Sequence, residues 1–463
     1  MEAVGQDTSS ETTADITVTT TEEITTTTEA TEQSYPLEEF NFEGETFTIL
    51  CRTDLEDEIH KEQETGDVYG DAIFQRNRAV EERLKIKLKH MAIPGDWANN
   101  DSFLTQVSNT IMSGDDEYQL IVGYMNYMPG SVTKGLYLDI NTLPTIEPEN
   151  PWWIQGYNDN VTINGKMYMA MGDLCSTMLR NAYCAYVNVD LLTQFGHNKE
   201  ELYQAVDEGK WTFDMLIGIA ENVKSDLNGD GKMDISDLHG ISMHDVTMRS
   251  LTNAFAIDYT TRNAEGLPEI ALNSERFLNA YQKVHAAATS DYWYPVYSHA
   301  KFVDGNTLFF FHCLFTSSYM RDMKSDYAVL PMPKYDEAQE KYRTETRDVT
   351  SILVVPNTVK NLELCGAAME SLNYESYQTV TPAYFDTVLQ LKQVRDEGSQ
   401  RMMDIIRETI YYDFGYALAG SIGSDIQSMM GYAITTPNIT SLLKGNSVVW
   451  TKKLDLLLDY FAK

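Results

Sequence analysis

The sharpest chemical motif in the sequence is a twelve-residue loop rich in oxygen ligands, DLNGDGKMDISD, at positions 226–237. Carboxylate or amide side chains stand at its first, third, fifth and twelfth positions, and glycine stands at the sixth, where calcium loops turn sharply. Ca²⁺ takes about six to eight hard oxygen ligands. The spacing therefore predicts a calcium site formed by Asp226, Asn228, Asp230, the backbone carbonyl of Lys232, and Asp237.

Two features leave a second interpretation of this loop open. Position twelve is Asp237 rather than Glu, so the shorter side chain has less reach for bidentate binding. A solvated Asx/Gly turn between two elements would need the same residue types. If calcium binds, Asp234 contributes through a water, and we expect the ion to be a structural staple remote from any ligand site.

Signatures of catalysis are missing. The sequence contains no HExxH, GxSxG, GxxxxGK[ST] or GxGxxG pattern, and its eight histidines form no cluster. The 69 acidic residues leave room for a carboxylate pair of the glycosidase kind, which the sequence alone does not locate.

Charge and hydropathy exclude other classes. There are 35 Lys and Arg against 69 Asp and Glu, a net charge of −34, so nucleic acid and anionic lipid would meet a repulsive field. The longest strongly apolar run, at 307–315, is far shorter than the roughly 20 residues that cross a bilayer.

The first 35 residues differ from the rest. Residues 1–34 contain 15 Ser or Thr and eight acidic residues, with no Lys or Arg and few large apolar side chains. Such a segment buries too little surface to offset the entropy of ordering, so we predict a disordered linker over 1–35.

The remainder alternates short apolar strands with amphipathic helices. Strands are expected at 46–52, 84–93 and 119–124, with helices between them, and this order predicts a parallel α/β sheet covered on both faces. The Asn164-Gly165 pair predicts a hairpin. Further helices are expected at 211–224 and 273–289, another strand at 351–356, and a mainly helical final 100 residues.

Several of these segments, in this order, resemble the extracellular solute-binding proteins of bacterial ABC transporters, the class that includes the maltose-binding protein. The resemblance is carried by QLIVGYMNYMPGSVTKGLYLDINTLP, INGKMYMAMGD followed by AYCAYVNVDLLTQFG, GKWTFDMLIGIAENV and SDYAVLPMPKYDEAQEKY. YFDTVLQLKQVRDEGSQRMMDII resembles a helical segment common in related proteins of gut Firmicutes. Together these segments span nearly everything after about residue 36.

The resemblance implies a two-lobed, hinged α/β fold of the periplasmic-binding-protein type (type II), with the ligand in a cleft between lobes. Lobe one would hold 36–175 plus 335–375, and lobe two 176–334 plus 376–463. It implies a monomer that captures a solute, expected to be a sugar or oligosaccharide, and delivers it to an ABC permease. Residues 1–35 would then be the stalk of an extracellular lipoprotein anchored by an N-terminal lipid, although the signal peptide and lipidated cysteine are absent here.

A sugar site needs polar side chains beside aromatic rings. By the resemblance, the expected ligand contacts in lobe one and at the first crossing are Asp54, Tyr124, Asn126, Tyr127 and Asp173. Those expected from lobe two and the second crossing are Trp293, Phe311, and Arg347 or Asp348. Each aromatic residue has packing in the core as its alternative, as do Trp152 and Trp153 beneath the hairpin.

The five cysteines are odd in number and far apart, so we predict small buried hydrophobic residues, with a Cys175–Cys184 bridge as the alternative. Two other function classes stay open: a secreted carbohydrate-active enzyme, which needs two carboxyl groups about 5–10 Å apart around a sugar, and a calcium-stabilised surface adhesion protein, which needs an exposed apolar patch.

Overall fold

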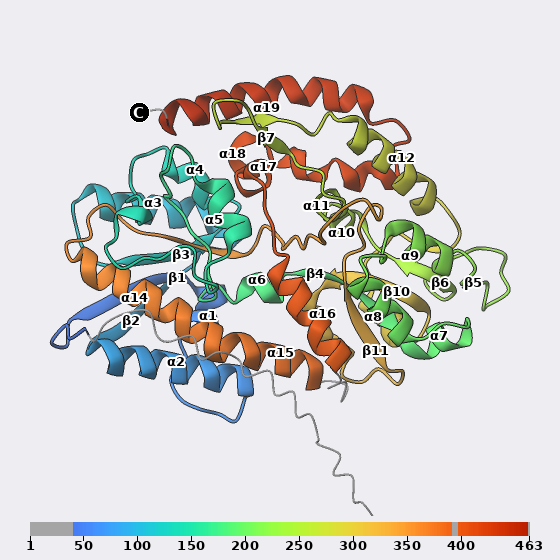
Figure 1. Ribbon diagram of the computed structural model, residues 1–463, viewed down its shortest axis with the longest axis horizontal. Helices are drawn as coiled ribbons and strands as arrows, with labels where there is room; N and C mark the ends of the chain where they lie inside the picture. Colours follow the sequence, from blue (N-terminus) through green and yellow to red (C-terminus); the bar gives the residue numbers. More distant parts are fainter. Residues whose placement is uncertain (1–39, 391–396, 462–463) are drawn as a thin grey trace, which may run out of the picture. The chain divides into compact units, whose positions relative to one another are not determined.

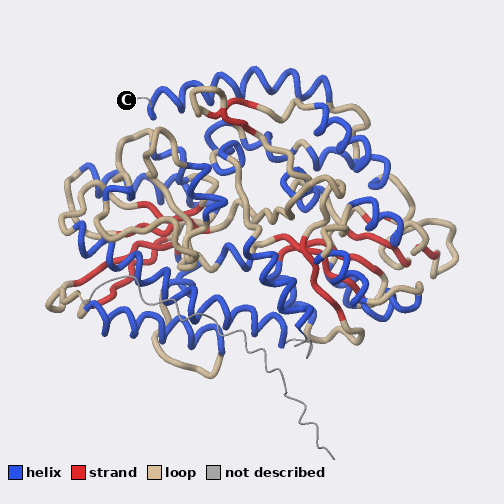
Figure 2. Tube along the Cα trace, in the orientation of Figure 1, coloured by secondary structure: helices blue, strands red, loops and turns tan. Residues whose placement is uncertain are grey.

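Two β-sheets and the helices around them make up the described part of the chain, residues 40–390 and 397–461, in the computed structural model (Figure 1). Figure 2 shows the strands as two separate groups, each with helices about it. The α/β class expected from the sequence is confirmed. The predicted linker at 1–35 lies outside the described residues.

The first sheet has four strands. Its order is β12-β3-β1-β2, with bounds Ser351–Val354, Leu120–Tyr124, Thr46–Arg52 and Lys87–Ile93. β1 runs parallel to β2 and β3, whereas β12 is antiparallel to β3. The prediction of a wholly parallel sheet is therefore wrong at one edge. There the chain enters β12 from the second sheet, and β12 runs in the opposite direction to its neighbour β3.

Local sequence explains the elements around β1. Six of the seven residues of β1 are buried, as expected of a strand covered on both faces. Helix α2 (Val68–Leu84) begins where the Asp67 carboxylate accepts the Gly70 N–H and ends at Lys85, which is left-handed. Helix α3 (Asn100–Met112) begins one residue before Asp101, so Asp101 lies in the first turn rather than at the cap.

The second sheet is mixed. Its path is β11-β4-β10-β6-β5, with β9 also paired to β6, and the bounds are Tyr327–Pro331, Tyr183–Asn188, Thr307–Cys313, Leu238–Ser242, Lys224–Ser225 and Trp293–Tyr294. β10 is parallel to β6 and antiparallel to β4. The carboxyl ends of β6, β9 and β10 therefore lie at one edge of this sheet.

The remaining helices pack over the two sheets and between them. Their bounds are α1 Glu56–Ile59, α4 Met128–Val132, α5 Gln155–Val161, α6 Thr177–Arg180, α7 Val189–Gln194, α8 Lys199–Asp207, α9 Phe213–Ala220, α10 Asp245–Met248, α11 Leu251–Ala254, α12 Glu275–Ala288, α13 His299–Val303, α14 Leu362–Glu375, α15 Thr381–Gln390, α16 Glu397–Glu408, α17 Phe414–Ala417, α18 Ala419–Ile422 and α19 Thr440–Phe461. A short two-stranded ribbon, β7 (Thr260–Arg262) with β8 (Pro268–Ile270), lies apart from both sheets.

Several segments run between the sheets. One leads from the first sheet to β4, and a second leads from β11 back to β12; the two are joined by an Ala182–Thr346 bridge. Near the C-terminus, α17 packs on α5 and α18 on α4, whereas the following short helix at 430–434 packs on α10 and α12. The C-terminal region thus contacts helices belonging to both sheets, and the lobe boundaries given above stay a prediction.

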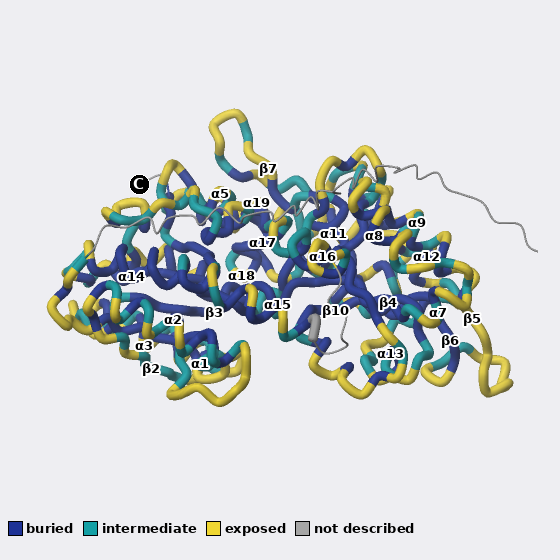
Figure 3. The backbone as a smooth tube through the Cα atoms, turned by 60° about the horizontal axis from the view of Figure 1, so that its bottom comes forward, coloured by how far each residue is buried: buried dark blue, intermediate teal, exposed yellow. Residues whose placement is uncertain are grey.

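The core confirms several sequence predictions. Strands β3, β4 and β10 are buried along their whole length (Figure 3). All five cysteines are buried and free, so no Cys175–Cys184 bridge forms. Asn164 and Gly165 both adopt positive φ angles, 54° and 74°, as the hairpin turn requires. Trp152 and Trp153 are buried. No helix among the described residues is both long and apolar enough to span a membrane.

Candidate functional site

A cavity of about 390 Å³ lies where strands of both sheets end. β1 ends at Arg52, β3 ends at Tyr124, and β10 ends just before Phe315. Open α/β sheets bind ligands outside the carboxyl ends of their strands, so this cavity is the candidate site. Its lining is Arg52, Asp54, Leu55, Asp96, Trp97, Tyr124, Thr177, Arg180, Asn181, Phe315, Tyr319 and Val349.

An ion pair occupies the first sheet's side of the cavity. Arg52 donates from Nε and Nη2 to the two carboxylate oxygens of Asp54, at 3.0 and 2.6 Å. The same guanidinium lies 4.4 Å from the centre of the Tyr124 ring. Burial raises the pKa of Tyr124, so its hydroxyl stays neutral. This wall therefore combines a fixed charge pair with an aromatic ring.

Glu58 holds the segment that crosses the cavity floor. Its carboxylate accepts the Thr177 N–H at 2.6 Å and the Ser351 hydroxyl at 2.7 Å, and its side chain is fully buried. Burial raises the pKa of Glu58. Because Thr177 begins the short helix α6, these bonds fix the position of Arg180 and Asn181 in the cavity.

Two exposed aromatic rings face the cavity from opposite sides. Trp97 is 63% exposed, follows β2, and starts a 3-10 turn (Trp97–Asn99) capped by Asp96. Tyr319 is 53% exposed and lies on the 3-10 segment Leu314–Met320 after β10. Both side chains line the cavity. They supply the apolar plates that a sugar ring requires.

Histidine and tyrosine rings extend the second sheet's side. The Tyr297 and His312 ring centres are 4.7 Å apart, and His244 and His312 stack at 5.8 Å. Desolvation, with the nearby His244 and Arg347, lowers the pKa of His312 to about 3, so this imidazole is neutral. Its Nδ1 lies 2.6 Å from the Thr316 hydroxyl oxygen.

A smaller cavity of about 270 Å³ adjoins the first and shares Arg180, Phe315 and Tyr319 with it. It is also lined by Tyr69 and Tyr384. We call the two adjoining cavities together the cleft, with Arg180 and Tyr319 in both parts.

Four of the residues expected from the sequence lie at or just behind the first cavity wall. Asp54 and Tyr124 line the cavity. Asn126 is buried, with its amide donating to the Asp348 carboxylate at 2.7 Å, and the Tyr127 hydroxyl donates to the Gly95 carbonyl at 2.8 Å. Both therefore support the wall. Arg347, also expected, lies next to the lining residues, where its backbone N–H donates to the Asn181 carbonyl at 3.2 Å.

Three expected contacts lie elsewhere, and each is already engaged in the core. Asp173 is fully buried, pairs with Arg407 at 2.5 Å and accepts the Thr381 hydroxyl at 2.6 Å. Trp293 is 3% exposed. Its indole N–H donates to the Met243 carbonyl at 3.0 Å.

Phe311 belongs to β10, all of whose residues are buried. Asp173, Trp293 and Phe311 therefore pack the protein rather than line the cleft. In their place the cleft presents Trp97, Phe315 and Tyr319. The rule that polar and aromatic residues just beyond strand ends face the site would have found Trp97, which follows β2 by a few residues.

The 226–237 loop is folded by its own hydrogen bonds. Asp226 accepts the N–H groups of Gly229 and Gly231 at 2.6 and 2.8 Å, while Asp237 accepts those of Leu227 and Asp234, both at 2.8 Å.

Calcium binding by this loop stays a prediction. Among residues 40–390 and 397–461, no three His, Cys, Asp or Glu side chains come together as a metal-ligating group. Moreover, the buried Lys301 ammonium donates to the Ile235 and Asp237 carbonyls, which places a positive charge beside the loop.

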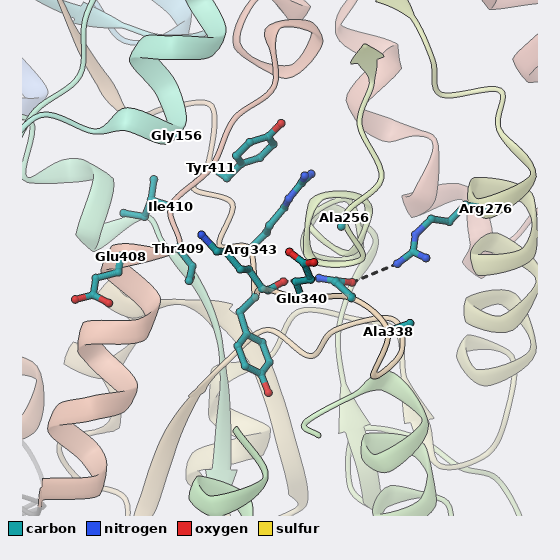
Figure 4. Close-up of a pocket in the computed structure, with 13 residues that line it drawn as sticks. Gly156, Ala256, Arg276, Ala338, Glu340, Arg343, Glu408, Thr409, Ile410 and Tyr411 are labelled. Atoms are coloured by element: carbon teal, nitrogen blue, oxygen red, sulfur yellow. Dashed lines mark hydrogen bonds between the residues drawn. The ribbon is translucent and has the colours of Figure 1, made fainter. Parts of the chain in front are cut away.

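A different cavity, of about 710 Å³, lies along two segments that run between the sheets, 338–343 and 408–411 (Figure 4). Both arginines that line it already have partners: Arg343 pairs with Asp258 at 2.6 Å and stacks on Tyr411 at 4.0 Å, and Arg276 donates to Gln339. The residues that line it follow no carboxyl end of a main-sheet strand. The cleft is therefore the better candidate site.

Comparison with known proteins identifies the fold. No family model matches the sequence, and no curated protein matches it. Among solved structures, the chain is similar to the GacH receptor of Streptomyces glaucescens, studied unliganded and with acarbose, at 12% identity and a TM-score of 0.57, over 89% of this chain and 99% of that one.

Two further structures are similar. The ABC substrate-binding protein Lmo0181 of Listeria monocytogenes, in complex with cycloalternan, gives 13% identity and a TM-score of 0.55 over 89% and 99% of the two chains. A cyclo/maltodextrin-binding protein complexed with maltotetraose gives 11% and 0.59 over 89% and 97%. At these identities the likeness establishes the fold, the two-sheet α/β architecture of periplasmic binding proteins.

Proposed function

We propose that this chain is the solute-binding component of an ABC importer and that it captures an oligosaccharide in the cleft. The observation that carries the proposal is the pairing of exposed Trp97 and Tyr319 with fixed polar groups at the strand ends of two sheets. Structures with this fold that hold acarbose, cycloalternan or maltotetraose support a carbohydrate ligand.

Each part of the cleft has a role in this proposal. Trp97 and Tyr319 stack on the apolar faces of sugar rings. The Arg52–Asp54 pair and the Asn181 side chain hydrogen-bond to hydroxyl groups, and Glu58 positions the floor. No bond of the sugar is broken. In the first cavity the carboxylates of Asp54 and Asp96 accept hydrogen bonds from Arg52 and Asn99.

The transport cycle follows from a ligand that touches segments of both sheets. Its extra contacts in a closed form would shift the population from open to closed. The closed form would then dock on a membrane permease, with the chain held outside the cell by an N-terminal lipid and acting as a monomer.

Isothermal titration against linear and cyclic gluco-oligosaccharides, with oligopeptides and polyamines as comparison ligands, tests the proposal. We expect saturable micromolar binding to oligosaccharides, weakened about 10- to 30-fold in Trp97→Ala but kept in Tyr432→Ala, because Tyr432 is an exposed aromatic residue that lines none of the cavities described above. Binding of no oligosaccharide, or release of reducing ends during incubation, would refute it; the second result would favour a carbohydrate-active enzyme instead.

Calcium binding by the 226–237 loop is a separate proposal, supported by its donor set and opposed by the Lys301 contacts described above. If calcium binds, it stabilises the loop through the oxygens of Asp226, Asn228, Asp230, Lys232 and Asp237, without a part in capturing the solute.

A further inference from the structure

The carboxylates around the cleft already have donors. Four of them accept hydrogen bonds from neighbouring protein groups, whereas the fifth, Asp57, makes ion pairs alone among the described residues, with Lys61 at 3.9 Å and Arg180 at 3.8 Å. The pairs are Asp54 with Arg52 at 2.6 and 3.0 Å, Asp96 with Asn99 at 2.7 and 3.1 Å, Asp348 with Asn126 at 2.7 Å, and Asp67 with the Gly70 N–H at 2.8 Å. The acceptors of the cleft are thus largely engaged before any ligand arrives.

The arginines at the cleft floor, in contrast, have N–H donors that are not engaged in hydrogen bonds. Within the described residues, the Arg180 side chain makes no hydrogen bond, its Nη1 atom is buried without an acceptor, and its ion-pair partner, Asp57, is 3.8 Å away. Arg347 makes no side-chain hydrogen bond or ion pair in the same part of the chain, although its side chain is only partly exposed. A guanidinium has five N–H donors, and buried donors are normally paired. Arg52 adds a third unsatisfied group, because its Nη1 atom is buried without a partner.

The backbone brings Arg180 and Arg347 to the same floor. The Arg347 N–H donates to the Asn181 carbonyl at 3.2 Å, and an antiparallel bridge joins Ala182 to Thr346. Arg180, Asn181 and Val349 all line the first cavity. Unpaired donors from two adjacent segments therefore lie next to the space that a ligand would fill.

We propose that the cleft selects carbohydrates that carry an anionic group, a carboxylate, sulfate or phosphate, with Arg180 and Arg347 as the residues that determine this specificity. The inference rests on the function proposed above and names its substrate class. Arginine binds planar anions through two parallel hydrogen bonds, which neutral hydroxyl groups do not match.

The acidity of the whole chain does not oppose this preference. A net charge of −34 repels anions at long range, but physiological salt screens exposed charges beyond about 8 Å. Contact with Arg180 and Arg347 is local. Salt should therefore speed the association of an acidic sugar by weakening the repulsion, and should raise its dissociation rate only modestly because the contacts are partly buried.

The test compares matched ligands by isothermal titration at one ionic strength. The probes are galacturonotriose, its methyl ester, maltotriose, and a monosulfated and a monophosphorylated trisaccharide. The variants are Arg180→Gln, Arg347→Gln and Arg180→Lys. Arg78→Gln is the control, because Arg78 is exposed on α2 and its substitution removes the same charge. Thermal melting checks that each variant is folded.

We expect at least one anionic probe to bind 10-fold or more tightly than the neutral probes. Arg180→Gln and Arg347→Gln should each weaken it 10- to 100-fold and change neutral binding less than 3-fold, whereas Arg180→Lys should recover part of the loss and Arg78→Gln should change nothing. The affinities of the sulfated and phosphorylated trisaccharides, compared with that of galacturonotriose, show which anionic group the cleft binds most tightly. Tight neutral binding without an anionic preference, or a preference that survives both glutamine variants, overturns this inference alone. Binding of no saccharide overturns the proposed function with it.

Discussion

Replacing Glu370 with alanine should destabilise the protein strongly. Glu370 lies on α14 and is fully buried, where it accepts the indole N–H groups of Trp152 and Trp153 at 2.7 and 2.9 Å and the Asn150 amide at 3.1 Å. Alanine would leave both buried indoles without an acceptor. Each unsatisfied buried donor costs about 1–3 kcal/mol, so we expect the free energy of unfolding to fall by about 3–5 kcal/mol. Urea denaturation at pH 8 measures the change.

The same carboxyl gives a pH dependence of definite sign. Burial raises the pKa of Glu370 from its ordinary value of 4.5 to about 7. Between these values the folded chain holds a proton that the unfolded chain has released, so stability falls as pH rises. Between these two pH values the free energy of unfolding falls by about 3 kcal/mol, because a shift of one pKa unit corresponds to about 1.4 kcal/mol.

Glu370→Gln cannot titrate. The free energy of unfolding of the native protein minus that of Glu370→Gln should therefore decline from pH 4.5 to 7.5. The same difference measured against Glu265→Gln, an exposed control in the β7–β8 turn, should not decline. A difference from Glu370→Gln that stays constant with pH, or a loss below 1 kcal/mol in Glu370→Ala, would refute this reasoning.

Three other changes test other parts of the account. Trp97→Ala should weaken oligosaccharide binding about 10- to 30-fold in titration, because about 2 kcal/mol of ring stacking is lost; an unchanged affinity would remove Trp97 from the site. Arg407→Met should cost about 3–5 kcal/mol in urea denaturation, because it leaves the buried Asp173 unpaired, and a cost below 1 kcal/mol would contradict that role. If the 226–237 loop binds calcium, 1 mM CaCl₂ should raise the melting temperature of the native protein but not of Asp226→Asn; equal curves with calcium and with chelator would rule the ion out.

Much of the architecture could be predicted because it follows from local patterns. The strand at 46–52 has the predicted bounds, since its continuous apolar run has a single stable environment, a sheet covered on both faces. The Asn164-Gly165 turn was predictable for the same kind of reason, because few residue pairs accept two positive φ angles. The direction of β12 could not be predicted, since it depends on a long connection from the other sheet.

The site was harder to predict because burial is decided by tertiary packing. Trp293 and Phe311 are the aromatic residue types that stack on sugars, but Phe311 lies in a strand paired on both sides, and Trp293 is buried with its indole bonded to the Met243 carbonyl. Asp173 looks available in the sequence, and only the fold shows that Arg407, more than 200 residues later, neutralises it. Arg180 carries no local signal, because only the fold shows that its side chain lines the cleft and that, among the described residues, its Nη1 atom is buried without a hydrogen bond.

The most direct test of the central claim is a crystal structure of the chain with the tightest-binding oligosaccharide at saturating concentration. We expect sugar rings in the cleft, one of them against Trp97 or Tyr319, with contacts to segments that follow strands of both sheets. Sugar bound instead in the cavity beside Arg343 and Tyr411, with none in the cleft, would contradict the account.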